Sequence, residues 1–240
     1  MNMVYTSIDN EKIKDIKKLN KKKYRDQENL FLIEGDHLII EAYKAGVLKT
    51  LIVLDGVDYK NYPNTIVVNE KVMKYISELD TPKKVMAICE KKNSNKLGNK
   101  VIVLDGVQDP GNLGTIIRSS VAFNFDTILI SNDTVDPYNS KVIRASQGMN
   151  MRTNIIEGDL KEYLKDLNDY KIYGTSVVNG KNVKDIVNKD KLCVVMGNEG
   201  KGVSPEVQQL CNDFIYINMS SECESLNVAV AASIIMYELS

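Results

Sequence analysis

The chain has 240 residues, of which 43% are apolar and 26% charged, with a formal net charge of −1. This composition is typical of a globular protein in water. No apolar run approaches the roughly 20 residues of a membrane span, and the start of the chain has no apolar signal-peptide segment, so we expect a cytoplasmic protein without membrane contact. The length leaves room for two small domains.

The first hundred residues are basic, with 19 Lys and Arg against 14 Asp and Glu. The densest cluster lies in the stretch EKIKDIKKLNKKKYR. Such a cluster can neutralise nucleic-acid phosphates, although many lysine runs are only the solvated face of a helix. Lys21, Lys22, Lys23 and Arg25 are the candidates for such contacts.

Helical and strand-like patterns alternate in this first part, which predicts a small α/β domain. Helices are expected at residues 13–19, 36–46 and 70–79, and strands at 30–35, 50–55, 64–69 and 85–89. The polar stretch KKNSNKLGNK follows and is interpreted as a linker. The predicted domains are therefore residues 1–95 and 98–240.

Helical and strand-like patterns alternate in the second part as well, and its strands are almost continuously apolar. They are expected at residues 101–105, 127–131, 171–176, 192–197 and 214–218, with an Ala-rich terminal helix over 225–239. Apolar strands flanked by helices indicate a mostly parallel sheet that is covered on both faces.

Cysteine and histidine are sparse. Cys89, Cys193, Cys211 and Cys223 have no C-x-x-C spacing, so we expect buried thiols and neither a disulfide framework nor a zinc site. The single histidine, His37, makes a catalytic triad improbable and is assigned no role. No metal is expected.

Three polar, glycine-marked loops follow strands of the second part, and loops at the carboxyl ends of parallel strands converge. The first holds Asp109 and Asn112 ahead of a helix that carries Arg118. The third, YINMSSECESLN, holds Ser225 and Asn227. Each has a plain structural alternative: turn residues in the first, a surface charge at Arg118, and in the third a Ser221–Glu224 capping box or a Ser225 N-cap.

The second loop, MGNEGKGVSP, has glycines at 197, 200 and 202. This spacing fits neither a Walker loop nor a dinucleotide fingerprint. Because Glu199 would repel a phosphate, the loop favours an uncharged or cationic group such as an adenosine or a sulfonium. The alternative is an ordinary turn, with Ser204 and Pro205 starting the next helix.

Together the segments DPGNLGTIIR, MGNEGKGVSPEV and ESLNVAVAA resemble the three motifs of the SPOUT RNA methyltransferases, SpoU/TrmH branch. VDPYNSKVIRASQG, which contains Arg144, also resembles the family, and KKYRDQENLFLIEGDHLIIEA is similar to its ribosomal-protein-like RNA-binding domain. The resemblance implies an α/β fold with a deep trefoil knot, a homodimer with the active site at its interface, and methyl transfer from S-adenosylmethionine to a ribose 2′-hydroxyl.

The resemblance also implies site residues. Those for catalysis are Asn112, Arg118, Glu199, Ser225 and Asn227; those for the cofactor are Thr175, Gly197, Asn198, Ile217, Met219 and Leu226; and Arg144 joins the RNA contacts. Since an arginine stays protonated, we assign Arg118 to the substrate phosphate, where it lowers the pKa of the hydroxyl and orients the ribose. Asn112, Ser225 and Asn227 would orient Arg118 and the ribose, and Glu199 would hold its motif or lie near the sulfonium.

Two positions depart from the family pattern, with Asn218 and Ser221 where proline and glycine are usual. They favour a rival interpretation, a catalytically idle RNA-binding or ribosome-assembly protein. The sequence is also compatible with a tRNA ribose methyltransferase and with a nucleotide-binding α/β enzyme unrelated to RNA. The two-domain layout resembles members that act on 23S ribosomal RNA.

Overall fold

A computed structural model describes residues 3–59, 62–92, 94–177, 179–187 and 189–240. The chain divides into two compact units. Residues 1–92 and 138–151 form the first, called here the N-terminal unit, and residues 93–137 and 152–240 form the C-terminal unit. The expected boundary between residues 95 and 98 lies close to the first division, but residues 138–151 pack with the N-terminal unit.

A five-stranded sheet forms the centre of the N-terminal unit, in the order β1-β4-β3-β5-β2. β1, β4 and β3 pair in parallel, and β5 pairs antiparallel with both β3 and β2. The strands are β1 (Val4–Tyr5), β2 (Leu30–Glu34), β3 (Leu48–Leu54), β4 (Thr65–Val68) and β5 (Val85–Glu90).

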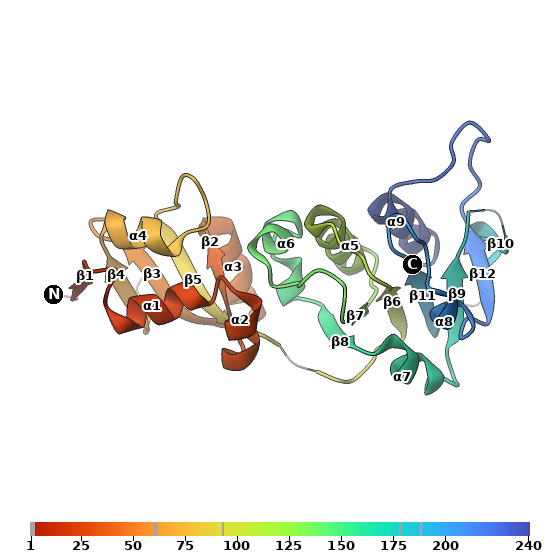
Figure 1. The fold of residues 1–240 in the computed structure, drawn as a ribbon, viewed down its shortest axis with the longest axis horizontal. Helices are drawn as coiled ribbons and strands as arrows, with labels where there is room; N and C mark the ends of the chain where they lie inside the picture. Colours follow the sequence, from red (N-terminus) through yellow and green to blue (C-terminus); the bar gives the residue numbers. More distant parts are fainter. Residues whose placement is uncertain (1–2, 60–61, 93, 178, 188) are drawn as a thin grey trace. The chain divides into compact units, whose positions relative to one another are not determined.

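Helices cover both faces of this sheet, because alternate residues of each strand point to opposite sides (Figure 1). One buried cluster joins Ile52 and Met86 of the strands to α1 (Glu11–Lys18) and α4 (Glu70–Ile76). The other joins Val53 and Ala87 to α3 (Asp36–Ala45). The short helix α2 (Lys22–Glu28), which the sequence analysis did not predict, follows α1 directly.

Residues 138–151 complete the second of these clusters. They form α6 (Ser140–Ala145) and the 3₁₀ turn η1 (Met149–Met151), and bury Ile143 and Met151 in the cluster. The rings of Tyr138 and Phe31 lie 4.9 Å apart between centroids. Gly148 has φ +80°, in the left-handed region that favours glycine.

Replacing Ile143 by alanine is expected to destabilise the N-terminal unit. Its side chain is 1% exposed, and truncation of such a residue typically costs about 2–5 kcal/mol. Hydrogen exchange should show faster exchange of the β2 and β5 amides. Val187→Ala, at a side chain that is 93% exposed, is the control. Loss of protection confined to the C-terminal unit would contradict this packing.

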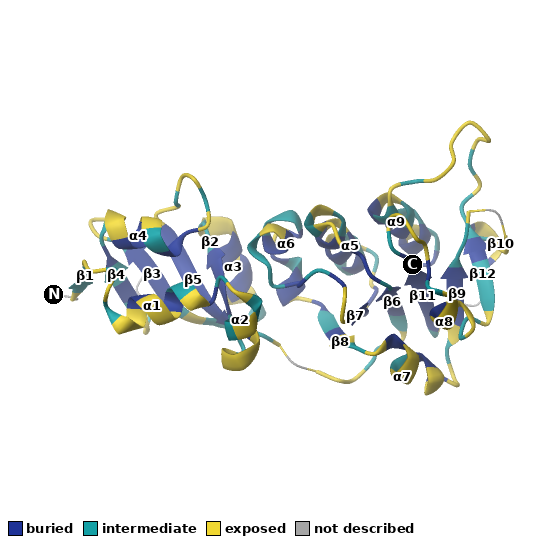
Figure 2. Ribbon diagram, in the orientation of Figure 1, coloured by how far each residue is buried: buried dark blue, intermediate teal, exposed yellow. Residues whose placement is uncertain are grey.

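The C-terminal unit is built on a seven-stranded sheet, in the order β10-β12-β9-β11-β6-β7-β8. Every pairing in it is parallel, which confirms the predicted sheet type. The strands are β6 (Lys100–Leu104), β7 (Thr127–Ser131), β8 (Asn154–Gly158), β9 (Lys171–Thr175), β10 (Lys181–Asn182), β11 (Leu192–Met196) and β12 (Asp213–Tyr216). Figure 2 shows the central strands buried.

Helices lie on both faces of this sheet (Figure 1). On one face α5 (Pro110–Ala122) packs against α9 (Val228–Glu238), and on the other lie α7 (Leu160–Lys165) and α8 (Pro205–Gln208). The 3₁₀ turn η2 (Val183–Asp185) follows β10. A long loop between β12 and α9 stands out from the sheet (Figure 1). In the described part of the chain, no helix has the length and apolar character needed to cross a membrane.

Candidate functional site

The strand order reverses between β6 and β11, and these two neighbours end side by side. Leu104 pairs with Met196 at the last position of both strands. β7 and β8 continue the sheet on one side, and β9 and β12 on the other. Such a switch point leaves a crevice beyond the carboxyl ends of the strands, where ligands of open α/β sheets bind. The loop after β6 and the loop after β11 therefore begin next to each other.

Three polar side chains join these loops to the start of α9. The Asn112 amide donates to Glu199 Oε1 at 3.0 Å, and Asn227 Nδ2 donates to Asn112 Oδ1 at 2.9 Å. Asn227 Oδ1 in turn accepts the backbone N–H of Ala229 at 2.9 Å. Three of the five predicted catalytic residues thus form one hydrogen-bonded chain, which we call the Glu199–Asn112–Asn227 chain.

The Glu199 carboxylate is the anionic end of this chain. It also accepts the backbone N–H groups of Gln108 at 3.3 Å and Asp109 at 3.2 Å. Burial acts to raise the pKa of Glu199, but the hydrogen bonds from Asn112 and these amides outweigh it and hold the pKa below its usual value. Glu199 is therefore ionised at neutral pH and ties the two loops together as an acceptor.

The loop after β11 is held in a tight hairpin. Asn198 and Gly202 exchange two backbone hydrogen bonds of 3.0 and 2.9 Å. Asn198 Oδ1 accepts the N–H groups of Gly200 and Lys201, and its Nδ2 donates to the Gly106 carbonyl at 2.7 Å. A Cβ at Gly197 would lie 2.1 Å from the Gly202 carbonyl carbon, so the turn closes only around a glycine. As the sequence suggested, α8 follows with Ser204 as N-cap and Pro205 as its first residue.

A cavity of about 580 Å³ lies beside this hairpin, within the C-terminal unit. Its wall comes from the ends of β9, β11 and β12, the whole hairpin and the first turns of α9. All six predicted cofactor residues line it: Thr175, Gly197, Asn198, Ile217, Met219 and Leu226. Thr175 Oγ1 donates to the Val195 carbonyl at 2.8 Å, which fixes its side chain at the end of β9.

The remaining two predicted catalytic residues lie apart from the chain of hydrogen bonds. Ser225 lines the cavity from the loop before α9. Arg118 is exposed on α5, six residues beyond Asn112, and is not among the cavity-lining residues. Within one copy of the chain, the structure does not bring Arg118 to the cavity.

The residues that cap α5 and α9 test the structural alternatives proposed for these loops. Asp109 is the N-cap of α5 and accepts the Asn112 N–H at 2.8 Å. Asn227 is the N-cap of α9, so neither a Ser225 cap nor a Ser221–Glu224 capping box begins this helix. These two structural alternatives do not hold, because Asn227 lies one position before the helix, where its carboxamide reaches both the helix and Asn112.

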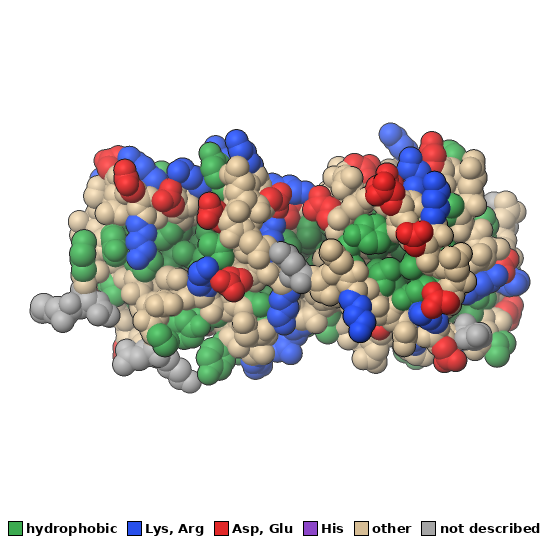
Figure 3. Space-filling model, turned by 90° about the horizontal axis from the view of Figure 1, so that it is seen from below, with side chains coloured by type: hydrophobic (Ala, Val, Ile, Leu, Met, Phe, Trp, Pro, Cys, Tyr) green, Lys and Arg blue, Asp and Glu red, His purple; other side chains and the backbone are tan. Residues whose placement is uncertain are grey.

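The predicted RNA-binding residues of the N-terminal unit are of two kinds. Lys21, Lys22 and Lys23 lie at the start of α2, and Lys23 Nζ lies 5.9 Å from the centre of the Tyr24 ring. Arg25 is only 5% exposed and donates to the Leu19 carbonyl at 2.9 Å, so it holds the connection from α1 to α2. Figure 3 shows one face of the molecule, on which basic and acidic side chains are interspersed.

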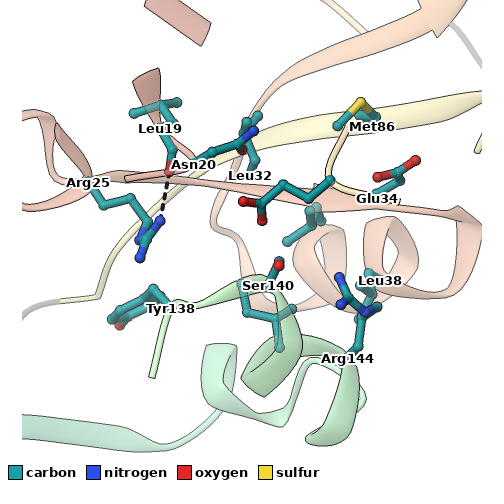
Figure 4. A pocket seen from close by; sticks show the side chains of 13 residues that line it. Leu19, Asn20, Arg25, Leu32, Glu34, Leu38, Met86, Tyr138, Ser140 and Arg144 are labelled. Carbon is teal, nitrogen blue, oxygen red and sulfur yellow. Dashed lines mark hydrogen bonds between the residues drawn. The ribbon is translucent and has the colours of Figure 1, made fainter. Parts of the chain in front are cut away.

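Arg25 and Arg144 line the same small cavity inside the N-terminal unit (Figure 4). Arg144 comes from α6 and lies near Ser140, and the Arg25 guanidinium points toward Tyr138. The cavity measures about 30 Å³, the space of a water molecule, and Glu34 and Glu78 also line it. Arg25 is therefore held by an internal contact, whereas Arg144 is half-buried at the lining of this cavity.

Several contributors to the site were missed by the sequence analysis. Asp105 and Gly106 follow β6 and bond to the hairpin, and Gln108 bonds to the Asp133 carbonyl and to Glu199. The sequence signal that could have identified these residues is their position in the loop that follows a buried strand.

Of the cysteines, Cys223 is exposed in the loop before α9, contrary to the expectation of a buried thiol. No group of three metal-ligating side chains is found among the described residues.

Two protein-family models match this chain. The model described as the SpoU rRNA Methylase family matches residues 99–237. The model described as the MRM3-like substrate binding domain matches residues 10–87. The first contains every element of the candidate site, and the second lies within the N-terminal unit.

Individual relatives are similar to this chain in sequence or structure along nearly its whole length. The chain is 35% identical to the 23S rRNA (guanosine(2553)-2′-O)-methyltransferase RlmP of Bacillus subtilis, over 97% of both chains. An AdoMet-bound rRNA methyltransferase from Sinorhizobium meliloti has a TM-score of 0.85 and 28% identity, covering 99% of this chain and 97% of that one. The structure of an RNA 2′-O ribose methyltransferase has a TM-score of 0.78 and 26% identity, covering 99% and 98%.

Proposed function

The chain belongs to the SpoU rRNA methylase family, and on this premise we propose that it methylates a ribose 2′-hydroxyl of 23S ribosomal RNA with S-adenosylmethionine. One observation carries the proposal: the Glu199–Asn112–Asn227 chain adjoins a cavity that is lined by all six predicted cofactor residues. Because Glu199 and Asn227 also line the cavity, both ends of this hydrogen-bonded chain lie next to a ligand bound there.

The cavity fits S-adenosylmethionine in size and chemistry. Its volume of about 580 Å³ lies within the usual range for sites of small ligands. Gly202 lines it with φ +70°, and a Cβ there would meet no protein atom within 4 Å, so the hairpin presents bare backbone to a ligand. Ile217, Met219 and Leu226 supply an apolar wall. When bound, the cofactor supplies an activated methyl group on a sulfonium sulfur.

The chain's own residues then position the ribose and its proton. Asn112 is fixed by Glu199 on one side and Asn227 on the other, so its orientation is set before substrate arrives. The Arg118 guanidinium binds a substrate phosphate and, as a fixed positive charge, stabilises the developing alkoxide. Ser225 offers a hydroxyl at the cavity rim, where it accepts or donates a hydrogen bond to the ribose.

A second copy of the chain is needed to complete this arrangement, because Arg118 lies away from the cavity of its own copy. We propose a homodimer that brings Arg118 of one copy to the cavity of the other. α9 supports it: the helix is apolar on nearly every side, yet Val230 is 47% and Tyr237 63% exposed. An all-round apolar helix is normally buried, so a partner surface is expected here.

Replacing Val230 by aspartate is expected to convert the dimer to a monomer. A charge at the centre of an apolar interface is desolvated without a partner, which costs several kcal/mol. Light scattering after size exclusion measures the mass. Val187→Asp, also at an exposed valine, is the control and should remain dimeric. A monomeric parent protein would contradict the dimer.

The trefoil knot that the resemblance implies is part of the proposal: the final segment would pass through the preceding loops before α9. The hairpin after β11 and the loop after β12 both line the cavity, although β9 separates their strands in the sheet. Cytoplasmic localisation is part of the same proposal, since ribosomal RNA is the substrate.

The N-terminal unit would select the RNA. Its region matches a substrate-binding domain, and Lys21, Lys22 and Lys23 give α2 a positive start. Phosphate contacts of this kind release counterions, so RNA affinity should fall as salt rises. Arg25, which donates to the Leu19 carbonyl, would support this surface, and Arg144 would be a further RNA contact.

The main rival function is that of a family member that binds RNA without catalysis. Asn218 and Ser221 favour it, since both lie in the exposed loop between β12 and α9, where proline would restrict the backbone. The test is incubation of the purified protein with 23S RNA and radiolabelled S-adenosylmethionine, followed by mapping of ribose methylation. Methylation of one nucleotide supports the proposal. RNA binding without methylation, together with no calorimetric heat from the cofactor, supports the rival function.

A further inference from the structure

Asp105, the first residue after β6, contacts both ends of the hairpin that lines the cavity. Its backbone N–H donates to the carbonyl of Met196, where the hairpin begins, at 2.9 Å. Its carboxylate Oδ2 accepts the backbone N–H of Ser204, where the hairpin ends, at 2.7 Å. A hydrogen bond from an N–H to a carboxylate at this length is of the strong, charge-assisted kind.

The hairpin between these two ends is internally stiff. The paired backbones of Asn198 and Gly202 and the closed turn at Gly197 leave it little freedom to change shape. Asn198 and Glu199 hold it to the loop after β6, and the Asp105 carboxylate holds its exit end, so these contacts together set its tilt against the sheet. Because every residue from 197 to 203 lines the cavity, a change of tilt moves the whole wall.

We propose that Asp105 is a positioning residue that sets the tilt of the hairpin and thereby the affinity for the cofactor. The inference rests on the proposed function, since it takes S-adenosylmethionine as the ligand. Asp105 does not itself line that cavity. It lines a second cavity of about 330 Å³ behind the hairpin, together with Ser204 and Asp159. It therefore acts through the hairpin backbone.

The test compares Asp105→Ala, Asp105→Asn and Asp159→Ala by calorimetric titration with S-adenosylmethionine. Asp159 is a matched control: it also lines the second cavity and accepts a backbone N–H, that of Lys161 at 2.8 Å, but it caps α7 and not the hairpin. Asp105→Ala should weaken cofactor binding about 10- to 100-fold, the equivalent of one hydrogen bond to a charged group. Asp105→Asn, which keeps an acceptor oxygen, should recover most of the loss.

Steady-state kinetics separates positioning from general damage to the fold. Asp105→Ala should raise the KM for S-adenosylmethionine by a larger factor than it lowers kcat, because Glu199 moves with the hairpin, while the KM for RNA stays near the parent value. A fall in kcat with unchanged cofactor affinity would overturn the inference, as would equal weakening by Asp159→Ala or full cofactor affinity in Asp105→Ala. A parent protein that binds no cofactor would overturn the proposed function itself, which is a distinct result.

Discussion

Replacing Arg118 by alanine is expected to lower the rate of ribose methylation about 100- to 1,000-fold, the usual effect of removing one preorganised charge from a developing oxyanion. Binding of S-adenosylmethionine should be unchanged, because Arg118 does not line the cavity of its own copy and, in the proposed dimer, its guanidinium binds the substrate phosphate. Single-turnover methylation and calorimetric titration of the same preparation measure the two quantities. The combination of lost rate with retained cofactor is the signature of a substrate-side role.

Two further variants define what the guanidinium contributes. Arg118→Lys keeps the charge but loses the bidentate geometry for phosphate, so it should restore only part of the rate. Lys165→Ala removes an exposed cation from α7 in the same unit and should leave the rate at the parent value. Full methylation by Arg118→Ala, with the cofactor still bound, would show that another group activates the hydroxyl.

Replacing Gly197 by alanine is expected to abolish detectable cofactor binding. The added Cβ would lie 2.1 Å from the Gly202 carbonyl carbon and 2.2 Å from the Val203 nitrogen. Both are backbone atoms inside a closed hairpin, so the hairpin must open, and the wall of the cavity moves with it. We expect the dissociation constant for S-adenosylmethionine to rise more than about 100-fold, which calorimetry would register as absence of heat.

Gly46→Ala is the control for this variant. Gly46 has a backbone conformation that favours glycine, with φ +69° at the end of α3, but a Cβ there meets no atom within 4 Å and the residue belongs to the N-terminal unit. It should cost about 1 kcal/mol of stability and leave cofactor binding intact. Cofactor binding by Gly197→Ala equal to that of the parent would contradict the geometry of the hairpin.

The fold class and most of its elements could be predicted from the sequence. Near-continuous apolar runs identified β6, β7, β9, β11 and β12 because a parallel sheet buried on both faces needs apolar side chains on both sides. β8, α2 and the two-residue strands β1 and β10 were missed. β8, with the sequence NIIEG, is half polar and lies at the edge of its sheet, and α2 is a charged stretch whose only buried side chain is Arg25.

The family and the three motif loops were also determined by the sequence, because each loop carries its own glycines and polar residues in order. Three features were decided only by the tertiary structure. The Glu199–Asn112–Asn227 chain joins residues more than 80 positions apart. Residues 138–151 fill the core of the N-terminal unit, and Asp105 bridges the two ends of the hairpin. Local patterns encode helices, strands and turns, but such pairings depend on which strands lie side by side, and the order β9-β11-β6 arises only when the sheet is assembled.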